Sequence, residues 1–275
     1  MRWNLSKPET LLVATCAALF ALACFGPFVG QAANYHSFAD QRELGGVPFA
    51  MDVLSNLPFA LAGIAGVVAL WRTPDHSLGN VTRAMAGLFF GGLIMTAAAS
   101  SWYHWRPDDA GLAVDRIGMA IAFAGLLGLA AATRISDRAG PALGLVLLVT
   151  APLAVHAWSV TGNLLPWVVL QSGGMLFVLA AAVMPRKSAA LDIRWAWVIF
   201  AYGIAKLLEA NDHEVYRLTG EIISGHTLKH VVAAFAACPV IAALRAPSIS
   251  KQNESGAASG FRRIKRMSTR RAGSF

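Results

Sequence analysis

The chain has 275 residues, of which 56% are hydrophobic and only 14% are charged. A soluble domain of this length could not bury so much apolar surface, so the composition excludes a soluble globular protein and predicts a polytopic membrane protein. The formal net charge is +8, but most of the excess of Lys and Arg lies in the C-terminal tail, 247–275. Because the rest of the chain offers no basic fold, nucleic-acid binding is not expected.

Eight apolar runs follow one another along the chain. Each is about 20 residues long and could therefore cross a hydrocarbon core of roughly 30 Å as a helix. The expected fold class is an all-α, polytopic transmembrane helix bundle. The eight runs are 10–31, 50–72, 83–105, 113–133, 141–160, 164–185, 193–210 and 225–245.

The first run has features of a secretory signal peptide, because Arg2 and Lys7 precede it and the sequence GQAAN follows it. Its apolar part, however, is longer than the roughly 7–15 residues usual for a signal. We therefore expect residues 1–34 to form a retained N-terminal transmembrane helix, or signal anchor.

The basic residues predict the orientation. If the N-terminus lies inside, the inner connections carry most of the Lys and Arg, whereas the outer loops hold little beyond Arg42, Arg106 and Arg217. Basic residues favour the cytoplasmic side, so both termini are expected in the cytoplasm. The tail, 247–275, is expected to be disordered. Its basic cluster would attract anionic lipid headgroups by about 1 kcal/mol per Lys or Arg near the surface.

Ionisable residues inside apolar helices, or at their ends, are costly and therefore point to a site. Under this topology they converge on the outer side of the membrane, whereas the inner halves of the same helices carry few such groups. The sequence thus predicts one polar site near the outer face. The converging residues are Asp52, Ser55, Asn56, Ser100, His104, Asp115, Lys206, Glu209, His226 and His230.

The sequence SGHTLKH places His226 and His230 four residues apart at the start of the last apolar run. On a helix, residues i and i+4 lie on one face about 6 Å apart, so two such imidazoles can bind one metal ion. His104 lies at the same depth on another helix and is the candidate third ligand. Three His ligands with a fourth position left open are typical of a catalytic zinc site rather than a closed structural one.

Zinc at such a site would serve hydrolysis, because it lowers the pKa of its water to about 7 and polarises a carbonyl oxygen. Asp115 lies across a short loop from His104 and could pass the proton of the water to a leaving group. Ser100 lies one turn before His104, where its hydroxyl could hold the water or donate to an oxyanion. Ser100 and Asp115 are therefore the candidate catalytic residues.

Each part of this pattern has a simpler explanation when it stands alone. An HxxxH pair at a helix end is often just two interfacial histidines, and its spacing would also fit copper or axial-type ligation. His104, in SWYHW, could belong to an aromatic belt at the membrane surface. Asp52, Ser55 and Asn56 could form a buried hydrogen-bond network that only holds helices together. Three His, one Ser and one Asp at one depth together favour the metal site.

The same five residues resemble the pattern of the alkaline ceramidase family. Ser100 and His104 form its SxxxH, Asp115 opens the next helix, and His226 and His230 form its HxxxH. The segments YHSFADQR, DVLSNLPFALAG and YGIAKLLEANDHEVY are similar to the bacterial ceramidase-like members. The family belongs to a wider group of seven-helix membrane hydrolases that includes the progestin and adiponectin receptors.

The resemblance implies a seven-helix core over residues 35–246, and the extra N-terminal helix before it is a departure from the family. It implies an integral protein of the bacterial inner membrane, with its site facing the periplasm. Zinc would be bound by the three histidines, with Ser100 and Asp115 as catalytic partners. The reaction would cleave the amide bond of an N-acyl lipid such as ceramide, giving a sphingoid base and a fatty acid. Other N-acyl lipids, such as ornithine-type lipids, would fit the same chemistry.

The chain departs from the family at a second metal site. Eukaryotic ceramidases carry an acidic Ca²⁺ site before their first core helix. Here Phe49 stands where a calcium-binding glutamate is expected, and only Asp40 and Glu43 keep the acidic character of the segment. The resemblance therefore implies calcium less strongly than zinc.

The competing hypothesis is a non-enzymatic seven-helix receptor or transporter in which the metal is structural. The sequence shows no inverted repeat of the kind that many transporters carry. Receptors do occur in the wider group, however. Lipid hydrolysis by the pure protein is the observation that separates the two hypotheses.

Overall fold

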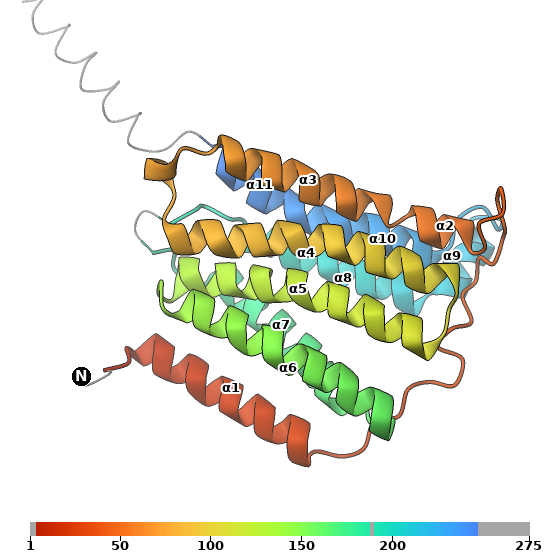
Figure 1. Ribbon diagram of the computed structural model, residues 1–275, viewed down its shortest axis with the longest axis horizontal. Coiled ribbons are helices and arrows are strands. Elements are labelled where there is room, and N and C mark those ends of the chain that lie inside the picture. Colours follow the sequence, from red (N-terminus) through yellow and green to blue (C-terminus); the bar gives the residue numbers. More distant parts are fainter. Residues whose placement is uncertain (1–3, 188–189, 247–275) are drawn as a thin grey trace, which may run out of the picture. The chain divides into compact units, whose positions relative to one another are not determined.

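The computed structural model describes residues 4–187 and 190–246. Within these ranges the regular elements are helices, which confirms the all-α prediction (Figure 1). The tail, 247–275, lies outside the described residues. The helices are α1 (Lys7–Phe25), α2 (Ala50–Leu54), α3 (Leu57–Arg72), α4 (Asn80–Trp105), α5 (Asp109–Arg134), α6 (Ala139–Thr161), α7 (Leu165–Val183), α8 (Trp195–Ala210), α9 (Asp212–Leu218), α10 (Gly225–Ala234) and α11 (Cys238–Arg245), with 3₁₀ turns at Asp75–Ser77 and Phe235–Ala237.

Seven segments of the described chain are long and apolar enough to cross a membrane. They are α1, α2 with α3, α4, α5, α6, α7, and α10 with α11. The remaining predicted run, 193–210, forms α8, which has 16 residues. At 1.5 Å per residue it extends about 24 Å, which is shorter than the hydrocarbon core. It nevertheless packs against α7 and α10 within the bundle.

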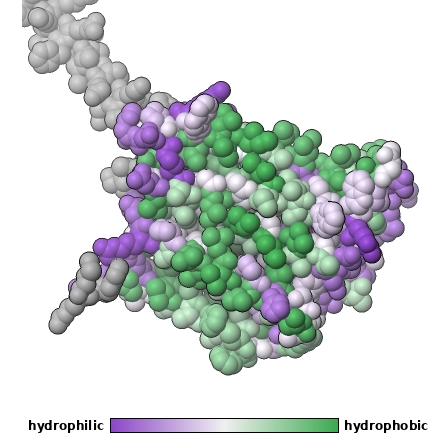
Figure 2. All heavy atoms as spheres, viewed as in Figure 1, coloured by the Kyte–Doolittle hydropathy of each residue, from purple (hydrophilic) through white to green (hydrophobic). Residues whose placement is uncertain are grey.

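The surface has the polarity of a membrane protein. In Figure 2, hydrophobic side chains cover the middle of the visible face, and hydrophilic side chains gather towards its two ends. Many large apolar side chains are exposed, among them Leu11, Leu145 and Leu176. Such exposure would be costly in water but is favourable in lipid. The exposed apolar surface of its helices therefore indicates an integral membrane protein.

The N-terminal helix begins earlier and ends earlier than its apolar run, 10–31. Ser6 caps α1, because its side chain accepts a hydrogen bond from Glu9 N and the Glu9 side chain bonds back to Ser6 N at 2.8 Å. This capping box starts the helix before the apolar run. Gly26 ends it. Glu9 also accepts a hydrogen bond of 2.6 Å from the Ser136 hydroxyl, which ties α1 to the start of α6.

α4 and α5 approach each other closely because glycines line their contact. A Cβ atom on Gly92 or Gly125 would overlap the backbone of the facing helix, and one on Gly118 would lie 2.7 Å from the Cβ of Ala99. Small residues let helix backbones pack together in a membrane, where dispersion forces drive association. This contact sets Ser100 of α4 opposite the first turns of α5.

The helical segment that contains α2 and α3 bends just before Pro58. Pro58 has no N–H to donate to the preceding turn, and side chains add hydrogen bonds to the backbone ones between the two helices. The carbonyl oxygen of Asp52 accepts hydrogen bonds of 2.9 Å from both the Ser55 hydroxyl and the Asn56 amide. The bend leaves Ser55 facing α10.

A long connection, residues 26–49, joins α1 to α2 and crosses the end of the bundle where α4 ends and α10 begins (Figure 1). We call it the capping loop. Its backbone is attached to the loop after α6, because Leu164 N donates to Val29 O at 2.7 Å and Val29 N donates to Asn163 Oδ1 at 3.1 Å. The capping loop therefore covers the end of the bundle where the sequence predicts the polar site.

Candidate metal centre

The three predicted ligands lie together. His104 comes from the last turn of α4, and His226 and His230 come from the first turns of α10. Their exposed fractions are only 1%, 7% and 4%, respectively. The ring centroids form a nearly equilateral triangle with sides of 4.8, 5.0 and 4.8 Å. One ligand nitrogen from each ring can be chosen so that all three lie within 4.8 Å of one another.

The spacing of the ring nitrogens fits a metal ion. Two imidazole nitrogens that bind one zinc ion at about 2.0–2.1 Å in tetrahedral geometry lie roughly 3.3 Å apart. His104 Nε2 and His226 Nε2 are separated by 3.2 Å. A direct hydrogen bond would also explain this one distance. It would not explain why the third ring, His230, lies at the same spacing from both others, whereas a shared ion explains all three positions.

The start of α10 is fixed tightly, which holds two of the ligands in place. Ser224 is the N-cap, and its hydroxyl accepts a hydrogen bond from Thr227 N at 3.0 Å. Asp212, at the start of α9, accepts a second one from His226 N at 2.7 Å. Gly225 lies so close to α8 and α9 that a Cβ atom there would overlap the carbonyl of Leu208. Glycine is therefore required where α10 begins.

His230 is oriented by Ser55. The Ser55 hydroxyl donates to Asp52 O at 2.9 Å and lies 2.7 Å from His230 Nδ1. Because the hydroxyl has one proton and donates it to the carbonyl, His230 Nδ1 must be the donor in the second bond. The Nε2 of His230 then keeps its lone pair for a metal. Partners of this kind fix the tautomer and the ring orientation of metal-binding histidines.

Replacing Ser55 with alanine is expected to lower metal affinity by roughly 10- to 100-fold, the usual cost of losing a residue that orients a ligand. Competition with a chelator on the purified protein measures this. Ser101→Ala is the matched control, since the Ser101 hydroxyl bonds Val53 O at 3.3 Å in the same region but touches no ligand. Equal affinities in the two variants would contradict the orienting role of Ser55.

Asp52 also reaches α10. It is fully buried, and its Oδ1 accepts a hydrogen bond of 2.7 Å from the Thr227 hydroxyl. Among the described residues, the Asn56 side chain bonds only within its own turn, to Asp52 O and Val53 O. Asp52 and Ser55 therefore join the second apolar run to α10, the helix that carries two ligands. Ser55 supports the candidate site directly.

Ser100 and Asp115, the predicted catalytic pair, are both buried. Ser100 lies one turn before His104 on α4, and Asp115 lies in the second turn of α5, the helix that packs closely against α4. The Ser100 hydroxyl lies near the Asp115 carboxyl. Asp115 Oδ1 has no hydrogen-bond partner among the described residues. The pair thus presents a carboxyl oxygen that can accept a proton at the end of the bundle that carries the histidines.

Lys229, which lies between the two ligands in sequence, turns towards α8. Its ammonium group donates to Glu209 Oε1 at 3.0 Å, and Lys206 pairs with the other oxygen of the same carboxylate. Lys206 and Glu209, which the sequence assigned to the polar site, therefore form an ion-pair cluster with Lys229 at its edge. None of the three contributes a ligand to the histidine triangle.

The capping loop forms the roof of the cluster, and the sequence did not predict this role. The buried ring of Phe38 lies 4.8 Å from the ring of His104 and 4.5 Å from that of His226, between centroids. His36 bonds the Tyr103 hydroxyl at 2.9 Å and Asp109 at 3.0 Å, which attaches the loop to α4 and α5. The only sequence signal for the loop was the family-like segment YHSFADQR.

Arg116 is a second residue that the sequence did not single out. Its side chain is buried, and its guanidinium carbon lies 4.1 Å from the ring centroid of Trp158. Its Nη2 donates to Gln31 Oε1 of the capping loop at 2.8 Å. Cation–π contact with Trp stabilises a buried cation. Arg116, the neighbour of Asp115, therefore fastens the loop to the helix that carries the candidate acid–base residue.

In the acidic segment before α2, an arginine pairs with the buried aspartate. Arg42 Nε donates to Asp40 Oδ1 at 2.8 Å, and Glu43 is exposed. Burial by itself would raise the pKa of Asp40, but the hydrogen bonds from Arg42 hold that pKa below its usual value. Because the guanidinium already balances the Asp40 charge and the Phe49 side chain offers no oxygen, these residues do not fit a calcium site as they stand.

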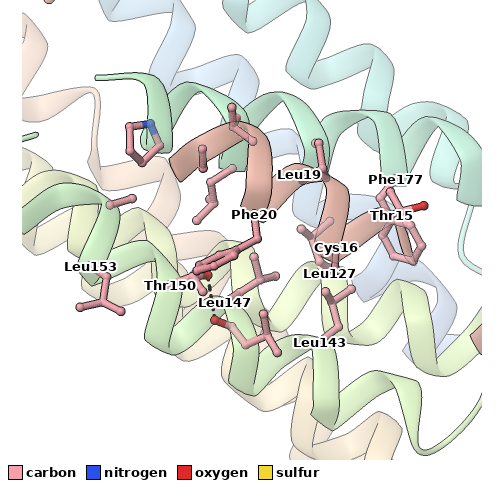
Figure 3. A pocket seen from close by; sticks show the side chains of 18 of the residues that line it. Thr15, Cys16, Leu19, Phe20, Leu127, Leu143, Leu147, Thr150, Leu153 and Phe177 are labelled. Carbon is pink, nitrogen blue, oxygen red and sulfur yellow. Dashed lines mark hydrogen bonds between the residues drawn. The ribbon is translucent and has the colours of Figure 1, made fainter. Parts of the chain in front are cut away.

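The described part of the chain contains a polar cavity and an apolar cavity near the ends and sides of the bundle helices. The polar one, of about 430 Å³, has His226 in its wall, together with Phe38 of the capping loop and Glu209, Asp212 and His213. The apolar one, of about 310 Å³, lies between α1 and helices α5, α6 and α7, and the labelled side chains that line it include Leu19, Phe20 and Leu147 (Figure 3). The apolar cavity shares no residue with the histidine cluster. Of the two, the polar cavity is therefore the one that borders the candidate site.

Comparison with known proteins leaves the family open. No family model matches the chain, and no curated protein matches it either. The resemblance to alkaline ceramidases accordingly remains a prediction from the motifs, and the geometry of the cluster has to support the functional conclusion.

Proposed function

We propose that this protein is a zinc-dependent membrane hydrolase that cleaves the amide bond of an N-acyl lipid. One observation carries the proposal. Three buried histidines from two helices meet at nearly equal spacings, at the end of a bundle of membrane-spanning length where Ser100 and Asp115 are also buried. A purely structural metal site would not need Asp115 with an unused carboxyl oxygen beside it.

Zinc is the metal that this donor set suits best. Three neutral imidazoles with no thiolate and no carboxylate among them are typical of zinc sites that keep a position open for water and substrate. His104, His226 and His230 would hold the ion. When bound, zinc would polarise the amide carbonyl and make a water molecule acidic enough to react near neutral pH.

The residues of the chain have separate roles in this proposal. Asp115 takes a proton from the attacking water as the water oxygen bonds to the carbonyl carbon. It then gives a proton to the amide nitrogen as the C–N bond breaks, so that a carboxylic acid and an amine leave. The Ser100 hydroxyl holds the Asp115 carboxyl in place and can donate to the carbonyl oxygen as negative charge develops on it.

The substrate would combine a polar end with an apolar chain. The polar cavity beside His226 has room for a small headgroup, and its wall contains carboxylates, amides and a serine. The surrounding helices present apolar surface suited to acyl chains. The distribution of basic residues favours the outer side of the membrane for the site, and the family resemblance implies that this is the periplasmic side of a bacterial inner membrane. Ceramide and ornithine-type lipids are both N-acyl lipids of this form.

Metal analysis combined with a lipid screen tests the proposal. Protein purified in detergent without added metal should contain about one zinc per chain, and it should release fatty acid and amine from at least one N-acyl lipid in stoichiometric amounts. Zinc without hydrolysis of any N-acyl lipid would favour the receptor or transporter hypothesis, in which the metal is structural. A folded protein without metal would overturn both.

A further inference from the structure

We propose that Asp212 is a positioning residue that couples closure of the capping loop to the placement of the ligand His226. The inference rests on the proposed metal site but concerns residues that the sequence analysis did not assign to it. Asp212 is the first residue of α9, between the last turn of α8 and the start of α10.

The two oxygens of the Asp212 carboxylate bind two different parts of the chain. Oδ1 accepts a hydrogen bond of 2.7 Å from His226 N, in the first turn of α10. Oδ2 accepts one of 2.9 Å from Ala39 N, in the capping loop. Hydrogen bonds to a charged acceptor are about twice as strong as neutral ones. One side chain therefore fixes both the ligand helix and the loop above it.

The loop residue that Asp212 holds lies next to the residue that covers the metal ligands. Phe38 immediately precedes Ala39, and its ring packs on the rings of both His104 and His226. The Ala39 bond thus sets the depth of the Phe38 ring. Because His226 touches Phe38 through its ring and Asp212 through its backbone, the loop cannot lift without disturbing the contacts of a metal ligand.

The wall of the polar cavity depends on the same contacts. Phe38, Asp212 and His226 all line it, as does His213, whose Nε2 lies 2.9 Å from Ser37 O of the capping loop. Loop and α9 together form the passage to the ligand. When the loop is closed, the Asp212 carboxylate completes both the passage and the N-terminal turn of α10. Loop opening and metal retention are consequently one linked equilibrium.

Asp212→Asn tests the coupling, because an asparagine side chain has one oxygen and can accept only one of the two N–H bonds. The variant keeps all three ligands. We expect its metal to dissociate roughly 10- to 100-fold faster than that of the wild type, and the amides of Ala39 and His226 to exchange hydrogen about tenfold faster or more. Glu214→Gln is the matched control, because Glu214 lies on the same helix but pairs with Arg217 at 2.6 Å instead.

His213→Ala supplies a second test that avoids Asp212. It removes only the contact with Ser37 O, so it loosens the loop without touching α10. If Asp212 couples the two elements, the His226 amide should exchange faster in this variant as well. An unchanged His226 amide, with faster exchange confined to the loop, would overturn the proposal.

A double-mutant cycle of Asp212→Asn with Phe38→Ala shows whether the two contacts are coupled or weaken metal binding independently. Coupled contacts give non-additive effects on the rate of metal dissociation, and additive effects would contradict the proposal. The hydrogen-exchange measurements can also be made and interpreted on protein without metal. A wild type that binds none would defeat the proposed function, whereas linked exchange at Ala39 and His226 would still support the positioning role of Asp212.

Discussion

Replacing His104 or His226 with alanine is expected to abolish metal binding. Each supplies one of three ligand nitrogens, and the remaining two histidines would leave an ion with half of a tetrahedral set. Losing a residue that merely orients a ligand costs roughly 10- to 100-fold in affinity, so the loss of a ligand itself should exceed that range. Elemental analysis of the purified variants measures the result, with the expectation of near-zero zinc per chain.

His156→Ala is the control for these variants, since His156 is exposed on α6 and lies outside the cluster. It should keep the zinc content of the wild type. Full zinc occupancy in His104→Ala or His226→Ala would show that the ion is bound elsewhere, and the assignment of the site would then fail. Circular dichroism on each sample shows whether the helices remain, so that loss of metal is not confused with loss of fold.

The fold follows from the sequence because lipid imposes a simple rule. Every backbone polar group in a membrane must be paired within the chain, so apolar runs of sufficient length become helices. All eight predicted runs contain helices of the structure. Their ends were less predictable. The capping box of Ser6 and Glu9 starts α1 early, and the run 193–210 yields only the 16 residues of α8.

Four of the five predicted site residues could be found from the sequence because they follow helical spacing. Ser100 and His104 share one face of α4, and His226 and His230 share one face of α10, so each pair could be placed from sequence. How the helices meet could not be read in the same way. Gly92 lies against α5 while its neighbour Gly91 faces open space, and no local pattern distinguishes the two.

The contacts of the capping loop over the site could not be predicted from the sequence, for a different reason. Its contacts join residues far apart in the chain, such as Ala39 with Asp212 and Gln31 with Arg116. The capping loop has no helical period, and nothing in the sequence marks His36 as a residue that contacts the helices. Only the geometry shows that His36 bonds Tyr103 and that Phe38 lies over the ligands.

Asp115→Asn is expected to keep the metal and lose turnover by roughly 10²- to 10⁴-fold, the range that a positioned acid–base residue contributes. Asparagine has nearly the same shape as aspartate and can still accept a hydrogen bond from Ser100. It cannot take up a proton from water and return it to the leaving nitrogen. Zinc content and the rate of fatty-acid release, measured on the same preparation, give the two readouts.

The combination of the two readouts decides the role of Asp115. Asp137→Asn is the control, because Asp137 pairs with Lys187 at 2.8 Å, away from the histidine cluster, and should change neither readout. Normal zinc with slow turnover at every pH identifies Asp115 as the proton carrier. Normal zinc with normal turnover would leave Ser100 or a water molecule to move the proton. Loss of zinc together with activity would make Asp115 a support of the ligand cluster, since a group that only transfers protons has no reason to affect retention of the ion.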